Sequence, residues 1–496
     1  MGILPWAHIK FPIVDLAEMV YQVRRLQLGY VPYRDTFTHH FLGFIIPSYA
    51  LGSAITLTPL VLKAMTLVFN FATAVLVWLI LREVSRPQVA WLGAVLTVTL
   101  GWFWSWQGFG FNVQSSLTPV IAAVLLLVIR ACIGPRESSL YWAAAWSGVL
   151  AICDQRAFVF LALLPLPFLF VSDFRRWRVA CLAVLSLIIV PASAAGYLWQ
   201  AGAWNDFVEQ TLVFPLFYRN HGVPFALVPW LSSGLGTFIG GERIAVPLML
   251  TGLGAAFFIE PRRVIKAVWV VSVICAASYA ILGGRAYPNY FLVFAPIALV
   301  LISLIPSYFA ARWPAAGKAV AVSLVALSAM YALRPGALLI ATGSVFVPAD
   351  ERTLDTVADF LRTRTSSQDG VLVWGYAPAI YVLSERFRTF RDMGLLSITG
   401  GNFGSSSGDA QGLLPHMVRE FDDYLTYSPP RIIAIYRVTR EPCPGKGLIQ
   451  RNLDYQNAPY LKRLRDVIAA SYRSELIVDG SCDHAEVFVL RNSAER

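Results

Sequence analysis

The stretch PNYFLVFAPIALVLISLIPSYF, residues 288–309, contains no charged side chain over its whole length. An α-helix needs about 20 apolar residues to cross the hydrocarbon core of a membrane, so this run is typical of a transmembrane helix. Comparable runs recur along most of the chain, and the pair on either side of Asp154 is short, which indicates a tilted or re-entrant segment. The predicted spans, about ten in all, cover 60–82, 88–106, 113–132, 139–153, 156–172, 178–199, 243–259, 265–283, 288–309 and 316–334.

The composition agrees with a membrane protein. The chain is 57% hydrophobic and 14% charged, whereas a soluble domain usually carries about 25% charged residues. Apolar runs alternate with short basic clusters from about residue 41 to residue 340, and the composition after them is that of a soluble protein. We therefore expect a polytopic α-helical membrane domain, residues 1–345, followed by a soluble α/β domain, residues 346–496.

The charge distribution predicts an orientation. The net charge is +10, but the basic residues form neither a stripe nor a tail, so nucleic-acid binding is not expected. Alternate short loops are rich in Arg and Lys, and such loops lie on the cytoplasmic side of a membrane. The N-terminal segment, the 200–242 loop and the soluble domain then lie on the extracytoplasmic side of a bacterial inner (plasma) membrane. The basic residues concerned are Arg82, Arg86, Arg130, Arg136, Arg175, Arg176, Arg178, Arg262, Arg263, Lys266, Arg312 and Lys318.

The segment before the first predicted span contains a helix and a polar turn. In VDLAEMVYQVRRLQL, residues 14–28, Asp15, Glu18 and Gln22 share one helical face, so the helix is amphipathic and suited to the membrane interface. Gly29 is placed to end this helix as a C-cap. The turn YVPYRDTFTHH, residues 30–40, follows. No predicted span precedes this segment, although it is expected outside the cytoplasm. Either a later helix drives its insertion or a further transmembrane helix comes before it, and we expect the second because the resemblance given next implies a span there.

This first loop resembles the first external loop of the GT-C glycosyltransferases. The elements that carry the resemblance are Asp15, Gly29, the sequence PYRD at 32–35 and the pair His39–His40. The superfamily includes enzymes similar to the dolichyl-phosphate-mannose–protein mannosyltransferases and the bacterial aminoarabinose transferases. Looser similarities are Lys63, GRAYPNY at 284–290 and VLVWGYAPAIYVLSER at 371–386. The chain departs from the pattern at Leu16, where many relatives have a second acidic residue, and at Asn289, where many have histidine.

The resemblance implies an activity. It implies transfer of a sugar from a polyprenyl-phosphate donor to a glycan, lipid or protein acceptor outside the cytoplasm, with inversion at the anomeric carbon. The leaving group is a phosphate, so the reaction needs a base for the acceptor hydroxyl and cations for the phosphate rather than a strong acid. Asp15 is the candidate base. The alternative is that Asp15 caps the helix, with Glu18 as the returning carboxylate of a capping box.

Cationic and polar candidates surround this base in the predicted topology. Arg34, Arg156 and Arg285 are candidate phosphate ligands, because a guanidinium matches phosphate with two hydrogen bonds. The alternative for Arg156 is an ion pair with Asp154, and the alternative for Arg285 is an interfacial anchor. The full set of predicted substrate-binding residues is Glu18, Tyr33, Arg34, Asp35, His39, His40, Arg156, Arg285, Tyr287 and Tyr290.

A divalent cation is a candidate ligand, because some GT-C enzymes use one. His39 and His40, together with Asp35, would hold it. Adjacent histidines point in different directions in any regular structure, so we predict no metal site and no other cofactor, and expect the histidines to contact substrate or to pack in the turn.

Helices and strands alternate in the predicted soluble domain. We expect helices at 350–364, 411–426 and 456–471 and strands at 371–374, 431–436 and 487–490, which form a partly parallel sheet. Cys443 and Cys482 can pair there if the compartment is oxidising. Two other functions remain: a lipid-glycan flippase or transporter, and a non-catalytic scaffold of glycan assembly. A transporter is expected to show internal repeats, and we find none.

Overall fold

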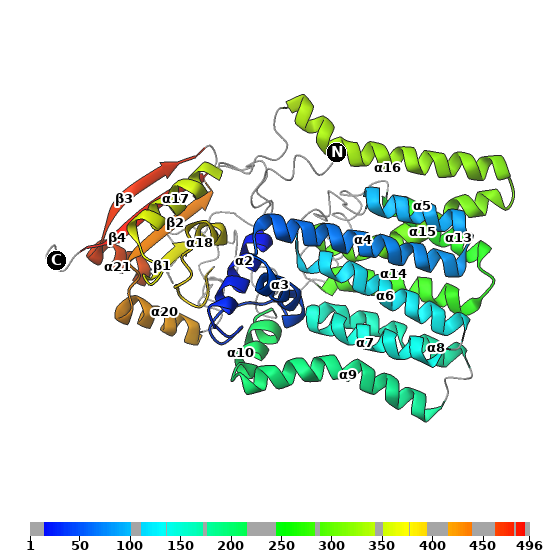
Figure 1. Cartoon of the computed structure of the whole chain (residues 1–496), viewed down its shortest axis with the longest axis horizontal. Helices are drawn as coiled ribbons and strands as arrows, with labels where there is room; N and C mark the ends of the chain where they lie inside the picture. The colour runs from blue at the N-terminus through cyan, green and yellow to red at the C-terminus, as the bar shows by residue number, and fades with distance from the viewer. Residues whose placement is uncertain are drawn as a thin grey trace.

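The computed structural model describes residues 14–100, 111–134, 136–171, 176–215, 245–282, 288–342, 351–375, 377–393, 415–438, 462–480 and 483–491. Within these ranges long helices pack side by side in one body, and a small sheet with its own helices forms another (Figure 1). The helices of the first body are α2 (Val14–Gln27), α3 (Leu42–Ala54), α4 (Pro59–Val84), α5 (Pro87–Leu100), α6 (Val113–Ile133), α7 (Glu137–Cys153), η2 (Gln155–Leu163), α8 (Pro165–Phe170), α9 (Trp177–Gln200), α10 (Trp204–Val208), η4 (Glu209–Val213), α13 (Ala245–Ile259), α14 (Arg263–Leu282), η5 (Pro288–Phe294), α15 (Ala295–Ala310) and α16 (Pro314–Thr342).

The helices of the bundle are long and apolar. Five of them are long and apolar enough to cross a membrane: Pro59–Val84, Val113–Ile133, Trp177–Gln200, Arg263–Leu282 and Asn289–Ala310. In the most apolar part of Asn289–Ala310, 89% of residues are buried, against 11% for Trp177–Gln200. The uncharged run at 288–309 therefore forms the centre of the bundle, and α9 lies at its edge. These long apolar helices make the chain an integral membrane protein.

Every predicted span overlaps a helix, with two differences. The span predicted at 156–172 is not one α-helix, because its first half is the 3-10 helix η2 and its second half is the short helix α8. Asp154 caps η2 through a bond from the Arg156 backbone N–H, and Pro165 begins α8. The apolar helix α3, which contains Pro47, was not among the predicted spans. The count of about ten spans stays a prediction.

The second body, which we call the C-terminal α/β unit, contains one four-stranded sheet in the order β1-β2-β4-β3. β1 and β2 are parallel and the other pairs are antiparallel, so the partly parallel sheet is confirmed. β3 was not predicted, because most of its side chains are at least partly exposed and its sequence lacks an apolar stripe. The predicted boundary at residue 345, Cys443 and Cys482 lie outside the described residues. The elements are α17 (Glu351–Arg364), β1 (Val371–Trp374), α18 (Pro378–Ser384), α20 (Pro415–Tyr427), β2 (Ile432–Val438), α21 (Lys462–Ser471), β3 (Tyr472–Asp479) and β4 (Asp483–Leu490).

Helix α2 lies between the two bodies (Figure 1). Met19 and Val23 belong to the apolar core of the bundle, whereas the ring of Tyr21 lies 5.3 Å from that of Tyr381 in the C-terminal α/β unit. The polar face is also covered, with Glu18 4% and Gln22 2% exposed. The first loop therefore folds over the polar face of α2, and the position of this helix at the membrane interface stays a prediction.

Candidate active site

The 30–40 turn is fixed by its own backbone. Gly29 has φ +91° and ends α2, as predicted for a C-cap glycine. Tyr33 also has a positive φ, +67°, a region that non-glycine residues rarely adopt. Its fully buried side chain donates a hydrogen bond from the hydroxyl to the His40 carbonyl at 2.8 Å, and its ring packs edge-on to Phe207. These contacts compensate for the strained backbone and fix the position of His40.

Gln210 on η4 joins the two ends of the same turn. Its side-chain amide donates to the Tyr33 carbonyl at 2.8 Å, and its oxygen accepts from the Thr38 backbone N–H at 3.0 Å. On the other side, Gln22 of α2 donates to the Phe37 carbonyl at 3.0 Å. The turn is therefore held from both sides by buried amides. Gln210 was not predicted, because the contact links segments more than 170 residues apart.

The turn brings both histidines close to α2. The ring centroids of His39 and His40 lie 4.2 Å apart, and His40 Nε2 lies 4.0 Å from a Glu18 carboxylate oxygen. The segment has no regular secondary structure, so the rule that neighbouring side chains point apart does not apply. Burial, His39 and Arg156 together hold the pKa of His40 well below its usual value. His40 is therefore neutral near pH 7.

Asp35 is not part of that group. Arg34 donates to both of its carboxylate oxygens, at 3.0 and 2.9 Å, and the Val31 backbone N–H donates to one of them at 2.7 Å. The Arg34 bond is the main cause that lowers the pKa of Asp35. Arg34 also donates to the Ala201 carbonyl at 3.0 Å, and its side chain is 48% exposed. This pair lies on the outer side of the turn.

A second polar group lies among the ends of the apolar helices. Arg156 donates to both carboxylate oxygens of Asp154, at 2.9 and 2.6 Å, so the alternative given for Arg156, an ion pair with Asp154, is confirmed. Tyr279 of α14 donates to Asp154 at 2.8 Å, and Gln114 of α6 donates to Tyr279 at 3.0 Å. The network continues to Asn289, which donates to the Gln114 carbonyl oxygen at 2.9 Å. It joins four helical elements at one end of the bundle.

The two groups are neighbours. The guanidinium of Arg156 lies 4.1 Å from the centre of the Tyr290 ring, and its charge contributes to the low pKa of His40. α3 begins two residues after His40 and approaches α7 so closely that a Cβ at Gly43 would lie 2.7 Å from the Ile152 carbonyl oxygen. This contact brings the end of the turn to the residues just before Asp154. The predicted residues Glu18, His40, Arg156 and Tyr290 therefore form one polar region.

Three further predicted residues have side chains outside the described part of the chain. Arg285, Tyr287 and the side chain of Asp15 lie outside the described residues. The backbone of Asp15 is described and lies within α2, which already includes Val14. Residue 15 therefore lies in the first described turn of α2, and the alternative that its side chain caps the helix is not tested.

The fold is similar to that of solved structures. The chain has a TM-score of 0.58 to the crystal structure of ArnT from Cupriavidus metallidurans in the apo state, with 10% identity over 97% of this chain and 94% of that one. The structure of the same protein bound to undecaprenyl phosphate also has a TM-score of 0.58, with 11% identity over 98% of this chain and 96% of that one. ArnT is an aminoarabinose transferase, so the resemblance to the GT-C glycosyltransferases is confirmed at the level of the fold.

A more distant match is the oligosaccharyltransferase of Archaeoglobus fulgidus tethered to an acceptor peptide, with a TM-score of 0.46 and 14% identity over 85% of this chain and 64% of that one. That score is too low to support an inference. No protein-family model matches the chain, and no curated protein matches it by sequence.

Proposed function

We propose that this protein is an integral membrane glycosyltransferase that moves a sugar from a polyprenyl-phosphate donor to an extracytoplasmic acceptor with inversion. The observation that supports it best is the polar region built from Glu18, His40, Arg156 and Tyr290 at one end of an apolar bundle with the ArnT fold. One ArnT structure holds undecaprenyl phosphate, a ligand whose headgroup is polar and whose tail is apolar. A donor of this kind needs polar groups beside apolar helices, and the polar region of Glu18, His40 and Arg156 would supply them.

In the proposed reaction Asp15 is the general base. An acceptor hydroxyl attacks the anomeric carbon from the face opposite the phosphate, its proton passes to Asp15, and the bond to the phosphate oxygen breaks with its electron pair. Asp15 precedes Glu18 by one helical turn, on the face that spacing assigns to Glu18 and Gln22. Both of those residues contact the 30–40 turn.

Arg156 is the proposed cation for the departing lipid phosphate. Asp154 and Tyr279 fix its guanidinium, and Tyr290 covers one face of it. A positioned cation stabilises charge that develops on the leaving group without reorganising during the reaction. Arg34 is more exposed and already bound to Asp35, so we assign it to the outer wall of the site.

The test is transfer from a panel of polyprenyl-phosphate sugars by purified protein in lipid vesicles. Asp15→Asn is expected to lower the transfer rate by about 10²–10⁴-fold, the usual contribution of a general base. The matched control is Asp359→Asn, an exposed carboxylate on α17 that is paired only locally with Arg362. It should keep the rate of the wild type.

Three outcomes contradict the proposal. Full transfer by a folded Asp15→Asn variant excludes Asp15 as the base, and a product that retains the donor's anomeric configuration by NMR excludes inversion. Movement of labelled lipid-linked sugar across the vesicle membrane without a covalent product indicates a flippase instead.

A further inference from the structure

Arg391 lies where the C-terminal α/β unit meets the 30–40 turn. It belongs to the segment that follows α18 of that unit. Its backbone carbonyl accepts a hydrogen bond from the Phe37 backbone N–H at 2.8 Å, and its Nη1 donates to the Arg34 carbonyl at 3.3 Å. A single residue of the unit therefore holds the backbone of the turn at two points.

The charge of Arg391 also joins the unit to the helix bundle. Nη1 donates to Asp206 of α10 at 2.8 Å, and Nη2 donates to Glu420 of α20 at 2.9 Å. The Arg391 side chain is 15% exposed, so water reaches little of this contact. Both carboxylates lie within hydrogen-bond distance of one guanidinium, and without it their like charges would repel across the boundary between the two bodies.

A neighbouring contact reaches the same turn by a second route. His416 Nε2 on α20 lies 3.3 Å from a Glu209 carboxylate oxygen on η4. The next residue of η4, Gln210, donates to the Tyr33 carbonyl and accepts from the Thr38 backbone N–H. η4 is a π-helix, a form of helix that is frequent at functional sites. The unit therefore contacts the turn directly and also supports it through η4.

We propose that the C-terminal α/β unit completes the transfer site, with Arg391 as a positioning residue for the 30–40 turn. This inference rests on the proposed function, in which the turn borders the site. The turn carries His40, whose Nε2 lies 4.0 Å from a carboxylate oxygen of Glu18 on α2, the helix that also contains the proposed base Asp15. Movement of the turn relative to α2 would change the space next to that base. Arg391 acts through the backbone of the turn and not by contact with the substrates.

A plain bridge between the two bodies explains the position of Arg391 less well. Such a bridge needs only the ion pairs, and partly exposed ion pairs stabilise little because water and salt screen them. The bonds to Phe37 and Arg34 instead fix a turn that contains Tyr33 at a positive φ. A strained residue persists only where surrounding contacts hold it, and Arg391 supplies two such contacts on either side of it in the fold of the turn.

The experiment compares Arg391→Met with the wild type as full-length proteins in lipid vesicles. Hydrogen exchange by mass spectrometry should be faster in peptides that cover residues 34–40 and unchanged in α4 and α15. In the same samples kcat should fall by up to about 100-fold, the loss that a small misplacement at a site can cause. The KM for the donor should change little, because Arg156 lies on another element. A purely stabilising role would lower the midpoint of thermal unfolding and leave turn exchange and kcat unchanged well below it.

The matched control is Arg388→Met in the same segment. Arg388 is exposed, and its side chain donates only to the Gln368 carbonyl, at 3.2 Å, among the described residues. This variant should keep the exchange and the kcat of the wild type. If Arg391→Met does not fold, Asp206→Asn removes one partner and keeps the guanidinium, and it should change both readouts in the same direction.

Three results are decisive. Unchanged exchange over residues 34–40 in a folded Arg391→Met variant, or equal effects of Arg388→Met, overturns the contact between the unit and the turn as a constraint. Faster exchange with an unchanged kcat overturns the positioning role. A wild type that transfers no sugar from any donor contradicts the proposed function itself, whatever the exchange shows.

Discussion

The ion pair of Asp154 and Arg156 is the most buried charged contact of the site, with side chains 5% and 14% exposed. A buried ion pair is stabilising only when the remaining polar atoms of both side chains also form hydrogen bonds. Tyr279 does this by donating to Asp154 and accepting from Arg156. The pair therefore acts as one preorganised unit, in which removal of either charge leaves the other uncompensated.

Asp154→Ala is expected to destabilise the protein by about 3–5 kcal/mol, the usual cost of breaking a buried pair from one side. The comparison is Asp359→Ala, which breaks the exposed pair with Arg362 and should cost less than about 1 kcal/mol. Thermal unfolding in the same detergent measures both. Equal shifts in the two variants would show that the Arg156 pair is solvated.

His40 makes stability depend on pH. Its folded-state pKa is well below its usual value, so below about pH 6.5 the unfolded chain binds more protons than the folded chain. Stability therefore falls as the pH decreases through this range, by up to about 1.4 kcal/mol per pH unit for one group. Within the described part of the chain, Glu18, His39 and Arg156 are charged or titratable groups that face it.

His40→Gln should lose less stability than the wild type between pH 7.5 and pH 5.5. The midpoint of thermal unfolding of both proteins is measured across this pH range. Parallel pH profiles for the two proteins would contradict the low pKa of His40.

At the scale of elements, the close approach of α3 to α7 holds the site together. Gly43 lies where a Cβ would be 2.7 Å from both Cys153 Sγ and the Ile152 carbonyl oxygen. The Ile152 carbonyl belongs to the backbone of α7, which cannot move aside in the way that the end of a flexible side chain can. A residue other than glycine at position 43 must push α3 away from α7, and His40 moves with α3.

Gly43→Ala is therefore expected to destabilise the protein by about 1–3 kcal/mol, the usual cost of overpacking. Gly196→Ala in α9 is the matched control, because no described atom lies within 4 Å of the position that its Cβ would occupy. That change should be neutral or stabilising by up to about 1 kcal/mol, since alanine is the better helix former. Unfolding midpoints that change alike for both variants would mean that the α3–α7 contact is looser than the structure indicates.

The elements themselves were largely predictable, and the site only in part. Long apolar runs predicted the helices that become α4, α6, α9, α14 and α15, because burial in lipid or in the bundle demands apolar side chains throughout. The partly exposed strand β3 has no such pattern and was missed. Asp15, His40 and Arg156 could be proposed from motif and position. Tyr279 could not, because its contact with Asp154 spans 125 residues and depends on how the helices pack.

At the scale of the whole molecule, α2 and the 30–40 turn connect the bundle to the C-terminal α/β unit. Arg391 contacts all of these parts. Its guanidinium pairs with Asp206 of α10 and Glu420 of α20. Its backbone carbonyl accepts a hydrogen bond from the Phe37 backbone N–H at 2.8 Å. Phe37 and Phe214 enter the apolar core of the C-terminal α/β unit. The site is therefore enclosed by both bodies, which accounts for the burial of α2 on more than one side.

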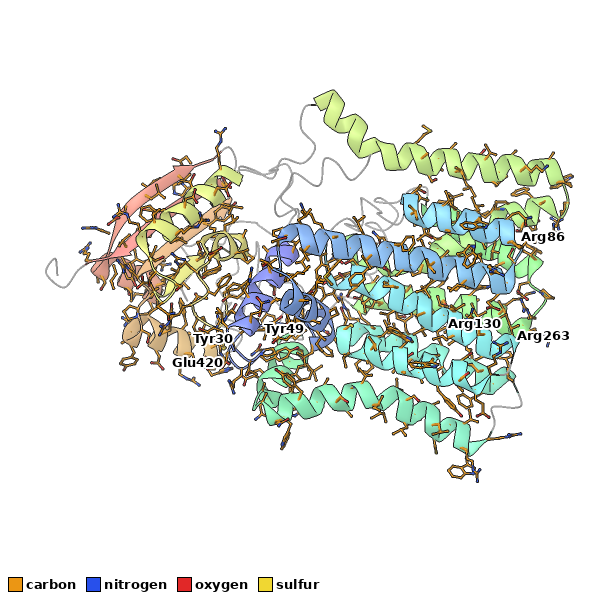
Figure 2. All side chains as sticks on the ribbon, viewed as in Figure 1. Tyr30, Tyr49, Arg86, Arg130, Arg263 and Glu420 are labelled. Carbon is orange, nitrogen blue, oxygen red and sulfur yellow. The ribbon has the colours of Figure 1, made fainter. Side chains whose placement is uncertain are left out.

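The same arrangement makes the orientation testable. Arg86, Arg130 and Arg263 lie at the end of the bundle far from the sheet, and Tyr30 and Glu420 lie at the other end (Figure 2). If basic loops are cytoplasmic, the first turn and the C-terminal α/β unit are both outside.

The orientation is tested in a variant without its native cysteines. In this variant Tyr427→Cys, at a position 80% exposed on α20, should react with a membrane-impermeant maleimide in sealed, right-side-out vesicles. Arg86→Cys and Arg263→Cys should react only after permeabilisation, and all three should react fully in detergent. Labelling of Arg86→Cys in sealed vesicles, with Tyr427→Cys protected, would reverse the orientation and place the proposed site on the cytoplasmic side.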